Sequence, residues 1–145
     1  MKIVIQKVKQ ASCTADGRVT GQIKRGYVLF VGFTTGDQSE LLDKAIKKIL
    51  QLRIFNDEND KMNLNILQVG GSILSISQFT LYANTDKGNR PSFVEALRPE
   101  EASVLYDEFN HRLAATGMVV QRGVFGSHMD IALINDGPVT IVLEF

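Results

Sequence analysis

The sequence predicts an α/β fold, a single domain over residues 1–145 of mixed β-sheets with two helices packed on one side. Short apolar runs typical of strands alternate with two longer stretches of helical spacing, in the order strands, helix, strand, helix, strands. A chain of 145 residues with 44% hydrophobic content can bury roughly 70% of its extended-chain surface in one core. No internal repeat or linker divides the chain, so we expect one domain.

Six segments carry strand patterns. Some alternate apolar and polar residues, as half-buried strands do, and others are continuous apolar runs typical of buried strands. Glycines or polar turn residues bound most of them, and a polar turn is expected over residues 56–61. The expected strands are residues 3–8, 27–31, 72–79, 118–121, 129–134 and 139–145.

Two stretches carry helical spacing. From Asp37 onward apolar residues recur on one face, and Asp37 has capping-box spacing to Glu40, which predicts a helix over about 37–52. A second helix opens at Pro99 with acidic residues in its first turn, and Gly117 is its expected stop. The buried stripe expected for this second helix is Ala102, Leu105, Tyr106, Phe109 and Leu113.

The balance of charge limits the possible partners. The 16 acidic and 16 basic residues cancel, so the chain lacks the positive field that holds a protein on long nucleic acids, and we expect no DNA partner. The N-terminal residues alternate instead of forming the apolar run of a signal peptide, and no stretch approaches the roughly 20 apolar residues that span a bilayer. We therefore expect a cytoplasmic protein with no membrane partner.

Standard catalytic and metal motifs are not found in the sequence. A serine or cysteine hydrolase needs a histidine base, and only His111 and His128 are available. His111 falls on the polar arc of the second helix and is interpreted as solvated, and a structural role is favoured for His128, which has no recognisable partner. Cys13 is interpreted as a small buried hydrophobe. Two histidines and one cysteine cannot supply a zinc ligand set, so we expect no metal and no cofactor.

Two short segments carry more specific information. Taken alone, Ser77-Gln78-Phe79-Thr80-Leu81 is the end of a strand, and residues 135–140 are an Asp-Gly hairpin turn followed by proline. Together they resemble the two signature motifs of the D-aminoacyl-tRNA deacylases, and the resemblance covers essentially the whole chain. The sequence departs from the family pattern at Cys13 and Asn89. Further segments that resemble the family are residues 1–12, 52–55, 61–63, 90–93 and 123–126.

The resemblance implies both a fold and an activity. The implied fold is the three-layer D-aminoacyl-tRNA deacylase-like fold, and the activity is hydrolysis of the ester bond of D-aminoacyl-tRNA, releasing free D-amino acid and tRNA. Mischarged glycyl-tRNA is a further expected substrate, and the implied process is chiral proofreading in translation. The implied partners are the aminoacylated 3′ end of tRNA and a second copy of the chain. In this homodimer the active site lies at the subunit interface, where a cis Gly137-Pro138 peptide faces residues 77–80 of the other subunit.

The resemblance also implies roles for individual residues. Backbone N–H groups near Phe79 and Thr80 are expected to stabilise the oxyanion, and Gln78 is expected to bind the substrate. Thr80 is expected to position water and not to attack, because its hydroxyl lacks an adjacent base. Phe79, Phe125 and Met129 are expected walls around adenine, and core packing is the alternative for each. The candidate catalytic residues are Thr80, Gln78, Phe79 and Ser77, and the candidate substrate-binding residues are Gly137, Pro138, Asn135, Phe125 and Met129.

Two other functions stay open when the residues are read alone. One is a non-catalytic dimeric module that binds an RNA end or a nucleotide, and the other is a small-molecule esterase. Turnover on D-aminoacyl-tRNA separates the first, and comparison with free D-amino-acid esters separates the second. Lys87 and Arg90, in a polar loop, are the expected contributors to a shallow salt dependence of tRNA binding.

Overall fold

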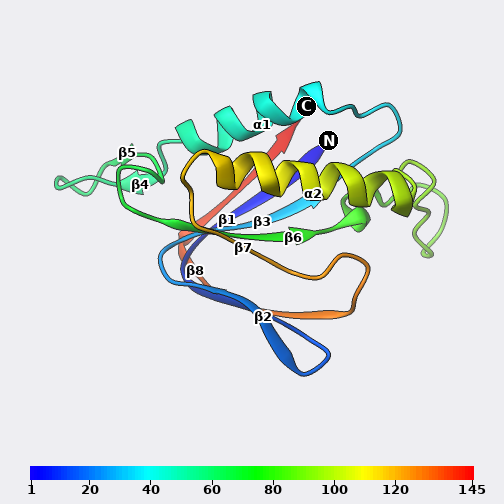
Figure 1. Cartoon of the computed structure of the whole chain (residues 1–145), viewed down its shortest axis with the longest axis horizontal. Coiled ribbons are helices and arrows are strands. Elements are labelled where there is room, and N and C mark those ends of the chain that lie inside the picture. Colours follow the sequence, from blue (N-terminus) through cyan, green and yellow to red (C-terminus); the bar gives the residue numbers. More distant parts are fainter.

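The computed structural model, which describes residues 1–145, has two helices on one face of a curved sheet (Figure 1). The strands are β1 (Lys2–Ala15), β2 (Arg18–Ile23), β3 (Gly26–Gly32), β4 (Phe55–Asn56), β5 (Met62–Leu64), β6 (Ser72–Ser77), β7 (Val120–Arg122) and β8 (Met129–Glu144). The helices are α1 (Glu40–Gln51), the 3-10 helix η1 (Phe79–Tyr82) and α2 (Pro99–Ala115). The predicted α/β class and the two helices on one side are confirmed. Neither the two α-helices nor η1 is long and apolar enough to span a membrane.

The main sheet is mixed and strongly curved. Its path runs β2-β1-β3-β6-β7, and β8 pairs with the other side of β1. β1 is antiparallel to β2, β3 and β8, whereas β6 is parallel to β3 and β7. The sheet curves until β2 approaches β6 and β7, and Gly21 permits this contact. A Cβ at Gly21 would lie 2.9 Å from Leu74 Cδ1 and 3.1 Å from Gln121 Cβ.

Alternation along the strands builds a core on each face of the sheet. Ile3 and Ile5 of β1 point toward the helices and belong to the larger core, together with Phe109 of α2. Beyond a register shift in β1, Val8 and Cys13 belong to a smaller core on the opposite face. Cys13 is fully buried, as the sequence predicted. The larger core fixes α1 and α2 over β3 and β6, and so positions the ends of these two strands.

The C-terminal strand differs from the prediction. We expected two strands joined by an Asp-Gly hairpin, but residues 129–144 form the single strand β8, and both of its halves pair with β1. The hairpin prediction is wrong because the chain does not reverse. Its ladder is interrupted instead, since β8 advances from Asn135 to Thr140 while β1 covers only Val8 to Gln6. The Gly137-Pro138 peptide within this interruption is cis, as the resemblance implied.

The predicted capping box is also wrong. α1 begins at Glu40, and its N-cap residue makes no side-chain capping hydrogen bond. The Asp37 carboxylate instead accepts hydrogen bonds from the buried Met1 amino group, with Met1 N 2.8 Å from Asp37 Oδ1, and from the backbone N–H of Thr34. An ion pair with a distant part of the chain therefore replaces the local cap. Asp37 thus fixes the loop after β3 to the start of the chain.

Candidate active site

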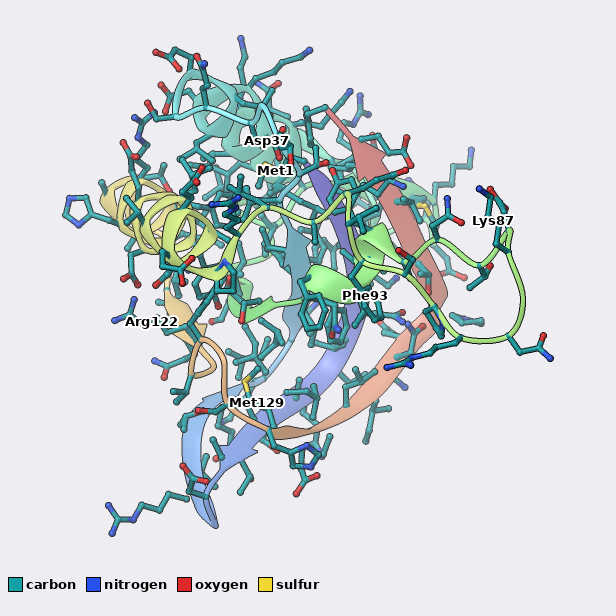
Figure 2. All side chains as sticks on the ribbon, turned by 90° about the vertical axis from the view of Figure 1, so that its right-hand side faces the viewer. Met1, Asp37, Lys87, Phe93, Arg122 and Met129 are labelled. Carbon is teal, nitrogen blue, oxygen red and sulfur yellow. The ribbon has the colours of Figure 1, made fainter.

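A cavity of about 630 Å³ lies where β3 and β6 end. Its walls come from these strand ends, from residues 93–99, from the first turn of α2 and from residues 125–131. Figure 2 looks toward this end of the molecule, with Phe93 near the centre and Met129 below it. The volume falls within the range of about 300–1,000 Å³ that is typical of small-molecule sites.

The end of β6 supplies one wall of the cavity. The strand stops at Ser77, and residues 79–82 turn into η1, so the expected strand over 72–79 is two residues too long. Ser77, Gln78 and Phe79 line the cavity. The Gln78 backbone N–H donates to Val31 O at 2.8 Å, which holds this turn against β3. Gln78 Nε2 donates to the hydroxyl of the exposed Thr80, which lies beside the cavity but not in its lining.

Aromatic side chains form the apolar walls. Phe79 is 57% exposed and packs edge-on against Phe93, with ring centroids 5.0 Å apart. Phe125 and Met129 also line the cavity, and Phe125 packs against Tyr106 of α2. The Tyr106 hydroxyl donates to Ser75 O at 2.8 Å, and burial raises its pKa, so it stays protonated and ties α2 to β6. The walls are therefore held by the core beneath them.

Charged groups are scarce around the cavity. Only Arg98 and His128 among the lining residues are ionisable, and none is acidic. His128 is highly exposed, with Nε2 3.8 Å from the Asp130 carboxylate, and its sequence context did not indicate a place at the cavity. His111 is exposed on α2, as interpreted. No group of three or more His, Cys, Asp or Glu residues could hold a metal ion.

The second motif lies outside this cavity. Gly137 and Pro138 are exposed on β8, and neither they nor Asn135 belong to the lining. Asn135 Oδ1 accepts from the Val139 backbone N–H at 2.9 Å, and its amide donates to the Gln6 side chain. Within one chain, the structure thus gathers Ser77, Gln78, Phe79, Phe125 and Met129 but leaves the 135–139 segment apart.

Lys7 contacts the second motif and was not identified from the sequence. It is 5% exposed, and its Nζ lies 3.6 Å from Asp136 Oδ2, immediately before Gly137-Pro138. The ammonium also lies 5.8 Å from the Phe55 ring centroid. A signal was present, because Ile3, Ile5 and Lys7 occupy alternate positions, and a lysine at an inward-facing position needs a partner.

Two solved structures share this architecture over nearly their whole length. One is described as a c-Myc DNA unwinding element binding protein and is 38% identical, with a TM-score of 0.94 and matched shares of 100% of this chain and 99% of that chain. The other is described as a probable eukaryotic D-amino acid tRNA deacylase and is 18% identical, with a TM-score of 0.85. The match covers 98% of this chain and 97% of that chain. The second structure is similar in fold alone. Its fold is the D-aminoacyl-tRNA deacylase-like fold that the sequence resemblance implied.

A family model described as D-Tyr-tRNA(Tyr) deacylase matches residues 4–144. The fold and this match define an ester hydrolase that acts on aminoacylated tRNA. The chain belongs to the D-Tyr-tRNA(Tyr) deacylase family. It is an enzyme that hydrolyses D-aminoacyl-tRNA, a proofreading step of translation, and the prediction of this activity is confirmed.

Proposed function

We propose that the enzyme works in the cytoplasm as a homodimer in which the 135–139 segment of one subunit completes the cavity of the other. The observation that carries this proposal is the separation of the two motifs, because residues 77–79 line the cavity while Gly137 and Pro138 lie exposed outside its lining. A two-fold axis would place each segment against the other subunit's cavity and create two equivalent sites.

Chirality would be selected by exclusion. Gly137 has φ +133° and no side chain, so the main chain of the 135–139 segment can approach the substrate closely. Backbone carbonyls there would accept hydrogen bonds from the substrate ammonium and leave no room for an L side chain. Glycine has no side chain to exclude, so mischarged glycyl-tRNA would also be hydrolysed.

The chemistry would rest on positioning. Water adds to the ester carbonyl, and the ester C–O bond then breaks, releasing the D-amino acid and returning a proton to the ribose oxygen. The first N–H groups of η1 have no acceptor within that helix, so those of Phe79 and Thr80 could stabilise the oxyanion. Because Gln78 Nε2 donates to Thr80 Oγ1, the Thr80 hydroxyl proton is free to orient the water.

The direct test compares D-tyrosyl-tRNA with L-tyrosyl-tRNA in a deacylation assay. We expect the D-ester to be hydrolysed at least about 100-fold faster, since exclusion of the L side chain acts as a steric clash. Similar rates on both esters would contradict chiral selection. Hydrolysis of free D-tyrosine ester at the rate of the tRNA ester would favour a small-molecule esterase.

Subunit mixing tests the shared site. A Gln78→Ala/Thr80→Ala chain and a Gly137→Ala chain should each be weakly active, and co-expression should restore about a quarter of wild-type activity, because half of random dimers are mixed and each holds one intact site. Light scattering checks that the co-expressed chains form dimers, and a different affinity tag on each chain identifies the mixed ones. No recovery in confirmed mixed dimers would mean that each site lies within a single chain.

A further inference from the structure

We propose that Arg98 binds the phosphate group of the terminal nucleotide of the tRNA substrate at the rim of the cavity. The inference rests on the deacylase activity of the chain and is independent of the proposed dimer. It adds a phosphate subsite to a cavity whose other walls are mainly apolar. Arg98 directly precedes α2 and is one of the residues that line the cavity, together with its neighbours Leu97 and Pro99.

The charge distribution around the cavity singles out this side chain. Arg98 is exposed and is in none of the chain's ion pairs, although Glu95, Glu100 and Glu101 are close in sequence. The other ionisable lining residue, His128, already faces the Asp130 carboxylate. Because no acidic residue lines the cavity, Arg98 is the cation best placed for an anion that reaches its rim.

The chemistry of the substrate places such an anion there. The scissile ester is on the ribose of the terminal nucleotide, and the same ribose carries a phosphodiester on its 5′ oxygen. When the ester lies beside Gln78 and Thr80, this phosphate is only one nucleoside away. An anion held against apolar walls loses hydration, and that loss is offset only by a charged or hydrogen-bonding partner. A guanidinium supplies two parallel N–H donors for phosphate oxygens.

The proposed phosphate ligand is the guanidinium of Arg98, and the N-terminus of α2 is not part of the subsite. Pro99 at the start of α2 has no N–H to offer, and Glu100 and Glu101 place negative charge in the first turn. Lys87 and Arg90 do not line the cavity, and Lys87 lies on a loop that projects from the body of the molecule (Figure 2). They are suited to phosphates farther along the tRNA, whereas Arg98 is suited to the terminal one.

Two substrates that differ in this phosphate provide the test. One is D-tyrosyl-tRNA, and the other is the D-tyrosyl ester of adenosine, which has no phosphate. For Arg98→Gln we expect kcat/KM on the tRNA to fall about 3- to 10-fold at low salt, with a salt dependence shallower by roughly one phosphate contact. On the adenosine ester the same variant should match wild type.

Two further variants control for charge. Arg18→Gln removes an exposed arginine at the start of β2, outside the cavity lining, and should change neither substrate. For Arg98→Lys we expect kcat/KM on the tRNA to lie between those of Arg98→Gln and wild type, because lysine keeps the charge but not the paired donors. An equal loss on both substrates, or no loss on the tRNA, would overturn the phosphate subsite. Failure of wild type to hydrolyse either D-ester would instead overturn the deacylase function.

Discussion

The end of β6 and the middle of β8 carry the two sequence motifs, and they are built in opposite ways. At the end of β6, side chains converge, since Ser77, Gln78 and Phe79 all line the cavity. In β8, Gly137 and Pro138 present main chain, which the side chain of Asn135 holds in place. In the proposed function, the end of β6 therefore contributes side chains to the site, whereas the β8 segment contributes main chain that carries no side chain at Gly137. Removing atoms should damage the first, and adding one should damage the second.

The largest expected effect comes from adding one methyl group to the 135–139 segment. A Cβ at Gly137 would lie 2.8 Å from Val139 Cγ2 and 3.1 Å from Val139 N, at φ +133°. For Gly137→Ala we expect the segment to shift and kcat/KM on D-tyrosyl-tRNA to fall about 100-fold, as misplacement of about 1 Å can do.

Gly36→Ala is the matched control. Gly36 also has positive φ, at +93°, but a Cβ there would meet nothing within 4 Å. This variant should lose about 1 kcal/mol of unfolding free energy through backbone strain and keep wild-type kcat/KM. Equal losses of activity in the two variants would mean that positive φ, and not the place of Gly137, accounts for the effect.

A smaller effect is expected from Lys7, whose ammonium group pairs with Asp136 in the 135–139 segment. Lys7→Met leaves the Asp136 carboxylate, whose side chain is 30% exposed, without its cation. Urea unfolding should show a loss of about 2 kcal/mol, less than for a fully buried pair because water reaches Asp136. We expect kcat/KM to fall as well, since Asp136 adjoins Gly137.

Lys2→Met removes a comparable cation from an exposed pair. Lys2 lies 3.5 Å from Glu144, and the two side chains are 34% and 66% exposed, so the loss should stay below about 1 kcal/mol. In the Lys7→Met background, Asp136→Asn should recover part of the stability, because it removes the unpaired charge. Similar losses for Lys7→Met and Lys2→Met would show that the buried pair does not support the segment.

The smallest expected effect is a loss of unfolding free energy at alkaline pH. It concerns Tyr82, in the helix that follows β6. Burial raises the pKa of Tyr82, at the end of η1, to about 12, and the negative charges of Asp37, Glu144 and Glu95 add to this. As pH rises above 10, the unfolded chain releases this proton while the folded chain keeps it. The stability that Tyr82 contributes is therefore present below pH 10 and lost between pH 10 and about 12.

Unfolding measured across this pH window checks the assignment. Wild type should lose unfolding free energy as the pH rises, and Tyr82→Phe should lose less of it. Tyr27 and Tyr106 are buried and also have raised pKa values, so part of the alkaline loss should persist in the variant. An identical pH dependence in both proteins would show that Tyr82 titrates as it does in the unfolded chain.

The sequence predicted the fold wherever local periodicity determines structure. Both helices lie close to their expected ranges, and the buried strands β3 and β6 follow from apolar runs. The errors share a cause, because distant partners override local signals at Asp37, which binds Met1, and at Asp136-Gly137, whose flanking residues pair with β1. Turn chemistry cannot reveal that a strand continues beyond the turn.

The site was predictable only in part. Residues 77–79, Phe125 and Met129 were identified by resemblance, and all of them line one cavity. Arg98 gave no local signal, because its role depends on residues that are distant in sequence and meet at the end of β6. Lys7 did give one, through its place in an alternating strand, but a lone lysine does not reveal which carboxylate lies opposite.

The interruption of β8 has a consequence for solubility. Within one chain, β8 has 16 residues and hydrogen-bonds to only one neighbour, β1, so its other side is a sheet edge that this chain leaves unpaired. A long regular edge can template the addition of strands from other molecules. Pro138 has no N–H to donate, and the irregular ladder around it divides the edge into two short pieces. Straightening the 135–139 segment into regular strand should therefore favour aggregation through this edge.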